Sequence, residues 1–219
     1  MRRVVVQTFL SLDGVMQAPG GPEEDPSGGF ELGGWSVNFW DDAMGQRMDE
    51  ALGRPFDLLL GRRTYDIFAA HWPHVTDDPA ADALNRATKY VASRSQRQLG
   101  WANSVLLRGD VGQEVTRLKE GSGPEIQVHG SGQLIQTLME HDLVDEYRLW
   151  VFPVLLGHGK RLFADGTIPR TLRLLDSATS TTGVVMGIYE RAGTVEVGSF
   201  ALEGPTPEEI ERRRRLAEE

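Results

Sequence analysis

Three short segments of this sequence combine small residues with hydroxyl or guanidinium side chains, a combination suited to binding phosphate. They are Gly61-Arg62-Arg63-Thr64, Ser93-Arg94-Ser95 and Gly130-Ser131-Gly132. The third segment stands between a strand-like run and a helix-like run, which leaves free backbone N–H groups at the positive end of a helix dipole. An Arg beside hydroxyls also suits the 2′-phosphate of an adenosine ribose, because its guanidinium binds phosphate through two parallel hydrogen bonds. Together the segments predict a ligand with several phosphates, although a Gly-Ser-Gly turn alone could equally be a plain connection.

The two standard nucleotide motifs do not occur. The dinucleotide fingerprint needs a third glycine where Ile135 stands, and it belongs at the first strand of a fold rather than late in the chain. No Gly-Lys-Ser or Gly-Lys-Thr is present, which excludes a Walker loop. Any nucleotide site here must therefore be assembled from several loops.

Two residues could supply or hold a proton near these loops. His129 directly precedes the glycine turn, and an imidazole titrates near neutrality, so it could donate a proton or bond a carbonyl; it could equally be bonded to backbone at the sheet edge. Asp13 is the second candidate, although in an Asp-Gly pair it is more often a turn-former. The other histidines are scattered without ligand spacing, so we expect no metal site.

The elements around these residues alternate. Strand and helix patterns follow one another up to residue 141, which predicts an α/β fold: a three-layer αβα arrangement with a mostly parallel central sheet. The strand-rich end predicts antiparallel C-terminal strands joined at Thr182-Gly183. Ligands of such sheets bind beyond the carboxyl ends of the strands, so we expect the three loops to converge there. The expected strands are 3–10, 56–60, 89–92, 104–107, 126–129, 146–154, 172–175 and 184–190, and the expected helices are 41–52, one from 62, 80–88, 111–120 and 133–138.

Composition excludes other classes. The chain has 219 residues, no cysteine and a net charge of −9, which argues against disulfides and against a nucleic-acid binder. No apolar run is long enough for a membrane span, and we expect a cytoplasmic protein. Residues 17–34 form a long Gly- and Pro-rich loop, and the aromatic segment 33–40 after it could line a pocket or pin the loop to the core. Residues 201–219 are expected to form a charged helical tail, capped by Thr206, after a single domain over 1–200.

Four motifs in this order resemble the dihydrofolate reductase-like superfamily: Ser-Leu-Asp-Gly at 11–14, Leu-Leu-Leu-Gly-Arg-Arg-Thr-Tyr at 58–65, Val-His-Gly-Ser-Gly at 128–132 and Pro-Val-Leu-Leu-Gly-His-Gly at 153–159. More closely, the chain is similar to stand-alone relatives of the reductase domain of bifunctional riboflavin biosynthesis proteins. The resemblance covers residues 3–191 and implies an NADPH site and a homodimer. It places phosphates on Gly61, Arg62, Arg63 and Thr64, the 2′-phosphate on Ser93 and Arg94, and the pyrophosphate and nicotinamide side on Gly130, Ser131, Gly132, Gln133 and Leu134.

The resemblance leaves the proton donor open. Asp13 and Gly14 would lie near the nicotinamide and the substrate. Dihydrofolate reductases carry a carboxylate early in the helix before the Gly-Arg motif, where this chain offers Asp41, Asp42, Asp49 and Glu50. The riboflavin enzymes tend to carry Glu where this chain has His129.

These observations favour an NADPH-dependent reductase of a small heterocyclic or carbonyl substrate, pteridine- or pyrimidine-like. Two alternatives remain at this point. One is an NADP-binding sensor without turnover. The other is a structural dimerisation module, which the apolar strand Leu149-Trp150-Val151-Phe152 would suit.

Overall fold

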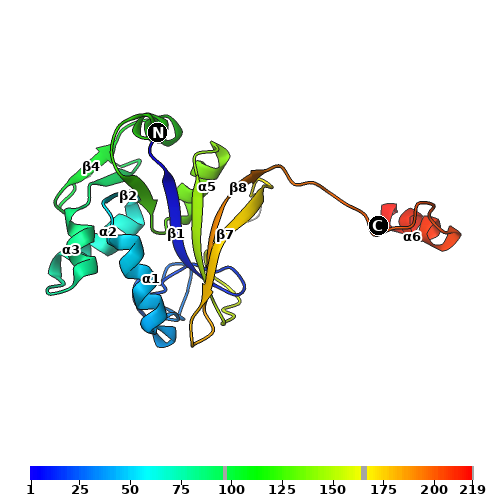
Figure 1. Ribbon diagram of the computed structural model, residues 1–219, viewed down its shortest axis with the longest axis horizontal. Helices are drawn as coiled ribbons and strands as arrows, with labels where there is room; N and C mark the ends of the chain where they lie inside the picture. Colours follow the sequence, from blue (N-terminus) through cyan, green and yellow to red (C-terminus); the bar gives the residue numbers. More distant parts are fainter. Residues whose placement is uncertain (96–97, 164–166, 219) are drawn as a thin grey trace.

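A computed structural model describes residues 1–95, 98–163 and 167–218 (Figure 1). Its central feature is an eight-stranded sheet in the order β4-β3-β2-β5-β1-β6-β8-β7. The strands are β1 (Val4–Ser11), β2 (Phe56–Gly61), β3 (Lys89–Ala92), β4 (Ser104–Leu107), β5 (Glu125–Val128), β6 (Glu146–Phe152), β7 (Thr171–Thr179) and β8 (Val185–Gly193).

The strand directions confirm the predicted sheet. All pairings from β4 across to β6 are parallel, whereas β8 runs antiparallel to both β6 and β7. The hairpin between β7 and β8 turns at Gly183, whose φ of +87° is one that glycine adopts without strain. β7 is longer than the predicted 172–175 because register shifts, one of them between Leu174 and Asp176, break the alternation that marks a strand in sequence.

Helices cover both faces of the sheet, which confirms the three-layer architecture. Leu59 packs with helices α4 and α5, while its neighbours Leu58 and Leu60 pack with α1, α2 and α3. Successive side chains of a strand point to opposite faces, so the two helix groups lie on opposite sides. The helices of the domain are α1 (Asp42–Leu52), α2 (Arg62–His71), α3 (Pro79–Arg86), α4 (Val111–Glu120) and α5 (Gly132–Glu140).

The aromatic segment after the long loop pins that loop to the core. Trp35 and Phe39 meet the buried ring of Phe152 edge-on, and Trp40 lies 5.9 Å from Trp150. The Trp35 Nε1–H also donates to the Gln17 carbonyl at 2.7 Å. Of the two roles considered for this segment, the structure shows the anchoring one.

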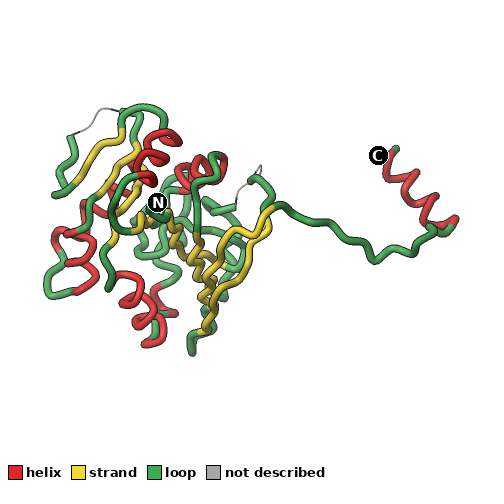
Figure 2. The backbone as a smooth tube through the Cα atoms, turned by 45° about the horizontal axis from the view of Figure 1, so that its top comes forward, coloured by secondary structure: helices red, strands yellow, loops and turns green. Residues whose placement is uncertain are grey.

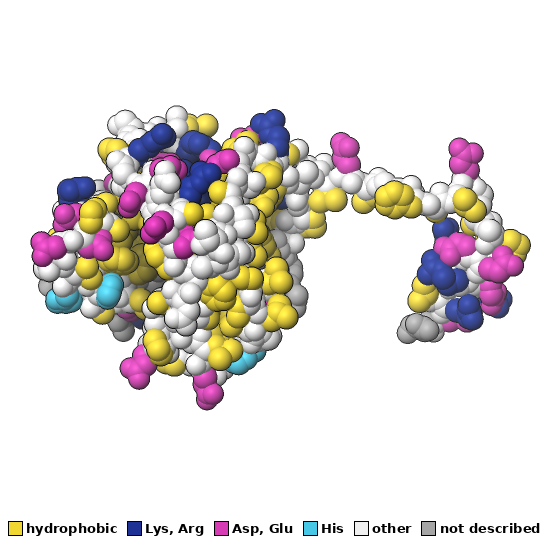
Figure 3. Space-filling view, turned by 60° about the horizontal axis from the view of Figure 1, so that its bottom comes forward, with side chains coloured by type: hydrophobic (Ala, Val, Ile, Leu, Met, Phe, Trp, Pro, Cys, Tyr) yellow, Lys and Arg dark blue, Asp and Glu magenta, His cyan; other side chains and the backbone are white. Residues whose placement is uncertain are grey.

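The C-terminal segment leaves the domain after β8. Residues 194–206 contain no helix or strand and lead to α6 (Pro207–Ala217), which stands apart from the sheet (Figures 1 and 2). Thr206 caps α6 by accepting from the Glu209 N–H, as predicted. None of its described residues is buried, and its surface mixes acidic and basic side chains (Figure 3). The tail ends at Glu219, which lies outside the described residues.

Candidate functional site

A cavity of about 1410 Å³ lies where β1, β2, β3 and β5 end. These strands are parallel, so their carboxyl ends share one edge of the sheet, and the three loops predicted to converge do so. The cavity exceeds the roughly 300–1,000 Å³ usual for one drug-sized ligand, which leaves room for two ligands side by side. Every predicted cofactor residue lines it: Gly61, Arg62, Arg63, Thr64, Ser93, Arg94, Gly130, Ser131, Gly132, Gln133 and Leu134, together with His129.

Three helices begin at the cavity, and two of them, α2 and α5, begin uncapped. The third, α4, has its cap Asp110 and its first residue Val111 in the lining. α2 and α5 have no side-chain cap and no acid in the first turn. The other α-helices in the described part of the chain each have a cap, from Asp41, Asp78, Asp110 and Thr206 respectively, and an acid in the first turn. Helix N-termini left with free N–H groups and no nearby carboxylate are suited to an anion. The cavity therefore has two positions prepared for phosphate.

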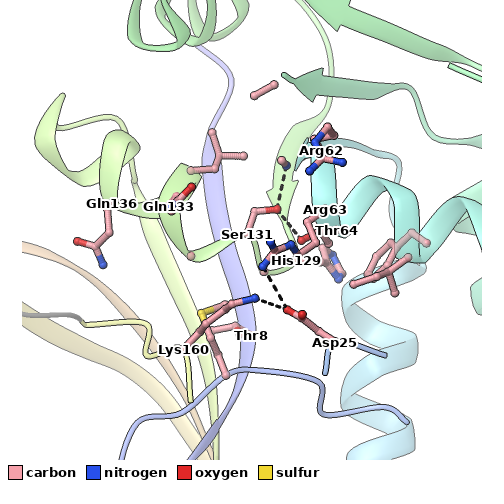
Figure 4. Close-up of a pocket in the computed structure, with 18 of the residues that line it drawn as sticks. Thr8, Asp25, Arg62, Arg63, Thr64, His129, Ser131, Gln133, Gln136 and Lys160 are labelled. Carbon is pink, nitrogen blue, oxygen red and sulfur yellow. Dashed lines mark hydrogen bonds and ion pairs between the residues drawn. The ribbon is translucent and has the colours of Figure 1, made fainter. Parts of the chain in front are cut away.

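Ser131 joins the two uncapped turns to each other. Its Oγ accepts the Gly61 N–H at 2.8 Å and donates to Thr64 Oγ1 at 2.6 Å (Figure 4). Any Cβ at Gly61 would lie 2.8 Å from that Oγ, so only glycine fits there. Ser131 itself adopts a left-handed conformation with φ +67°, after Gly130 at φ +89°. The Ser131 hydroxyl thus fixes the distance between the two anion positions, a role the sequence did not reveal.

The cations around the cavity differ in how far they are already paired. Arg62 bridges to Asp66 at 2.9 Å, and Lys160 and Arg63 both reach Asp25 (Figure 4). Arg94 is exposed and has no ion pair within the described residues. It stands next to Ser93, whose Oγ bonds Ser95 within the described residues, so this loop presents a guanidinium beside a hydroxyl.

His129 lies just past the end of β5, enclosed between that strand and α2. Its Nε2 lies 2.7 Å from Gln127 Oε1, and its ring meets Phe68 edge-on with centroids 6.4 Å apart. Burial, and secondarily the nearby Arg148 guanidinium, lower the pKa of His129 to about 4. The imidazole is therefore neutral near pH 7. The prediction that it supplies a proton is not supported at this pH.

Asp13 is not among the residues that line the cavity, and a catalytic role for it stays a prediction. Its carboxylate accepts from Ser11 Oγ at 2.6 Å, from the Leu156 N–H at 3.1 Å and from the Gly157 N–H at 2.8 Å. The Ser11 bond and the two backbone bonds lower the pKa of Asp13 to about 2. The side chain holds the 11–14 turn against the 156–157 turn, and its Oδ2 lies 3.7 Å from the guanidinium of Arg161, which lines the cavity.

The acids of α1 are also outside this cavity. Asp41 caps the helix and accepts from Thr181, and neither Asp42 nor Asp49 contributes to the lining. Glu50 lines a separate, smaller cavity of about 210 Å³ between α1 and the sheet residues Glu125, Arg148 and Trp150. The carboxylate expected by resemblance in this helix is therefore not presented to the large cavity.

The structure adds lining residues that the sequence did not single out. Gln7, on β1, is 3 % exposed, and its Oε1 is buried without a partner among the described residues. Glu24 comes from the long loop; burial raises the pKa of its carboxyl, which accepts from the Gly20 N–H at 2.6 Å. Neither residue belongs to a motif, so only their placement could reveal them.

Comparison with known proteins decides the family. The model of the RibD C-terminal domain family matches residues 2–186. This chain belongs to that family. Among its relatives is the uncharacterized protein YyaP of Bacillus subtilis (strain 168), 28% identical over 197 residues, covering 88% of this chain and 96% of YyaP.

Solved structures show that this RibD C-terminal domain protein has the dihydrofolate reductase-like fold. A putative riboflavin biosynthesis protein from Shewanella sp. PV-4 superposes with a TM-score of 0.61 at 21% identity, covering 87% of this chain and 99% of that one. Dihydrofolate reductase from Enterococcus faecalis, solved as a complex with NADP(H), gives 0.54 at 12% identity, with 86% and 96% covered. At these identities the likeness establishes the fold.

No helix in residues 1–95, 98–163 and 167–218 combines the length and apolar character needed to cross a bilayer. The same residues contain no group of three His, Asp or Glu side chains placed to hold a metal ion.

Proposed function

We propose that this protein is an NADPH-dependent reductase that transfers hydride to a small heterocyclic or carbonyl substrate. One observation carries the proposal: two uncapped helix N-termini surround a single cavity together with Arg94, which has no ion pair among the described residues. NADPH carries a pyrophosphate and a 2′-phosphate, so its anionic groups match these three positions in kind. The RibD C-terminal domain family and the NADP(H) bound by the Enterococcus faecalis enzyme support the same assignment.

Each part of the cavity has a separate task in this proposal. The first turns of α2 and α5 bind the pyrophosphate, and Ser93 with Arg94 binds the 2′-phosphate. The bound nicotinamide would supply the hydride. A flat substrate then lies beside His129, against the aromatic rings of Phe9 and Phe68 and the amide of Gln7. The protein contributes position and exclusion of water. We place this activity in the cytoplasm.

The experiment is a titration of the protein with NADPH and with NADH. We expect NADPH to bind more tightly, and Arg94→Ala to weaken NADPH about 10- to 100-fold, because a charge-assisted contact to phosphate is lost. NADH affinity should change little. Arg108→Ala is the control, since Arg108 is also exposed at a strand end but does not line the cavity. Equal affinity for the two nucleotides, or none for NADPH, would overturn the proposal.

Turnover separates the reductase from a sensor. A reductase must oxidise bound NADPH when a panel of heterocycles and carbonyl compounds is offered. Binding without oxidation for every compound would favour the sensor instead.

The proposal includes a homodimer. One face of the β7–β8 hairpin carries Leu174, Val185 and Tyr189. Leu174 is 51% exposed and Val185 is 44% exposed. β7 is an edge strand, whose unpaired backbone groups are available to another chain. Sedimentation should show a dimer at micromolar concentration and a monomer for the double variant Leu174→Glu, Val185→Glu. A wild-type monomer would contradict this part.

A further inference from the structure

The contacts of Gln127 determine which nitrogen of His129 carries the proton. Gln127 is fully buried, and its Nε2 donates to Glu125 Oε1 at 2.7 Å and to the Ala51 carbonyl at 3.0 Å. Both partners only accept, so the amide cannot be turned around without facing oxygen to oxygen. Its Oε1 must then accept from His129 Nε2, 2.7 Å away. His129 is therefore the Nε2–H tautomer.

Glu125 is in turn fixed as a carboxylate. Arg148 donates to both of its oxygens, at 2.9 and 3.1 Å, a two-point geometry that favours the ionised acid. Although burial raises the pKa of Glu125, the bonds from Arg148 and Gln127 outweigh it and lower that pKa. Glu125 is thus not protonated, and it cannot donate a hydrogen bond to Gln127 Oε1.

The second nitrogen of His129 is left free. No described residue bonds Nδ1, and this atom is not among the buried unpartnered atoms, so it is accessible in the cavity that His129 lines. The charges acting on the ring are Arg148 and Glu125, and the stronger effect, that of Arg148, disfavours a second proton. Nδ1 is therefore a lone-pair acceptor.

We propose that Gln127 is a positioning residue which, held by Glu125 and Arg148, fixes the proton of His129 on Nε2 and leaves Nδ1 as an acceptor for an N–H or O–H group of the substrate. This inference rests on the proposed function, since it concerns the substrate side of the same cavity. It adds that the group docked on His129 must be a hydrogen-bond donor. His129 binds that group and does not protonate it.

The first test is made on the protein without ligands. Long-range ¹H–¹⁵N spectra of imidazole-labelled protein should show His129 at pH 7 as neutral, with the proton on Nε2. An imidazolium, or a proton on Nδ1, would overturn the proposal. This measurement needs no NADPH and no turnover. The state of His129 can therefore be confirmed even if the protein is not a reductase, and refuted even if it is one.

Two variants show whether Gln127 causes this state. Gln127→Leu removes the acceptor, and we expect a mixture of tautomers. Gln127→Glu puts a carboxylate beside Nε2 and should raise the pKa of His129 toward neutrality. Gln46→Leu, on the exposed side of α1, is the matched control and should leave the spectrum unchanged. If neither Gln127 variant changes the state of His129, Gln127 has only a packing role.

The donor requirement is tested with uracil, which has two N–H groups, and 1,3-dimethyluracil, which has none. Uracil should shift the Nδ1 resonance of the wild type, and dimethyluracil should not. Gln127→Leu should weaken uracil by the factor by which the Nε2–H tautomer loses population, about twofold for an even mixture, while NADPH affinity stays unchanged. A shift with both compounds, or with neither, would overturn the assignment of Nδ1 to a substrate donor.

Discussion

Two kinds of helix start occur in this domain, and they differ in what satisfies their N–H groups. α1, α3 and α4 begin with an aspartate that accepts from the third residue after it. α2 and α5 begin with Gly61 and Ser131, which provide no such cap. Both uncapped starts open on the large cavity. Of the capped starts in the described residues only that of α4 lies there, and its Asp110 carboxylate already accepts from the Gln113 N–H.

A cap contributes about 1 kcal/mol to stability, so two helices without one forgo about 2 kcal/mol. Ser131 recovers part of this by accepting the Gly61 N–H, but it leaves the first-turn N–H groups beyond Gly61 free. The difference indicates that caps serve the stability of a helix, and that their absence here reserves the dipole for a ligand.

The largest effect should come from adding a carboxylate cap to an uncapped helix. In Ser131→Asp the carboxylate occupies the α5 N-terminus and repels phosphate, so we expect NADPH to bind about 100-fold more weakly, about 3 kcal/mol. Aspartate tolerates the left-handed conformation of Ser131 and can still accept from Gly61. Calorimetry would measure this, with Ser131→Asn as the uncharged control. An unchanged affinity for Ser131→Asp would remove the distinction between the two kinds of start.

The second-largest effect concerns the stability of the protein at acidic pH, because His129 lies between β5 and the uncapped start of α5. The pKa of His129 is about 4 in the folded protein, against about 6.5 for an unfolded chain. As pH falls below 6.5 the unfolded state takes up the proton first, so stability decreases until pH 4 and then levels off. The loss should reach about 2 kcal/mol, discounted for partial exposure. Denaturant titrations from pH 4 to 7.5, compared with His129→Gln, would show it; equal slopes for the two proteins would contradict the prediction.

Removing the cap of a capped helix should affect only the stability of the protein. Asp78→Ala removes the bond to the Ala81 N–H, so we expect a loss of about 1 kcal/mol and a Tm lower by about 2–4 °C. NADPH affinity should not change, because Asp78 does not line the cavity. Asp78→Asn, which keeps a cap, is the control. A change in NADPH affinity would show that capped starts also act on the site.

The smallest effect is expected at α6, a capped helix with no buried residue. Removing residues 201–219 should change the unfolding free energy by less than about 0.5 kcal/mol, as for other exposed segments. Differential scanning calorimetry of the shortened chain would measure it. A large destabilisation would show that the tail docks on the domain.

The convergence of the three loops could be predicted because it follows from a rule of topology. Once residues 56–60, 89–92 and 126–129 are recognised as parallel strands, their carboxyl ends must share an edge. Helix caps are also local: Asp41 and Thr206 could be assigned from the residues that follow them.

The role of Asp13 could not be predicted in this way. The Asp-Gly pair correctly indicated a turn, but two bond donors to the carboxylate, Leu156 and Gly157, come about 140 residues later. The same holds for Ser131, whose partners Gly61 and Thr64 are 70 and 67 residues earlier.

The sequence by itself determined the strand and helix order, the glycine turns and the residues able to bind phosphate, because each depends on neighbours within a few positions. Only the tertiary structure decided which of them meet. It left Arg94 without an ion pair among the described residues and bound the Asp13 carboxylate to two backbone N–H groups. It also left α2 and α5 uncapped at one cavity, and it buried His129 near Arg148 of β6, which lowers the pKa of the imidazole. Charge and hydrogen bonding act across space, and the chain brings these groups together only when the sheet forms.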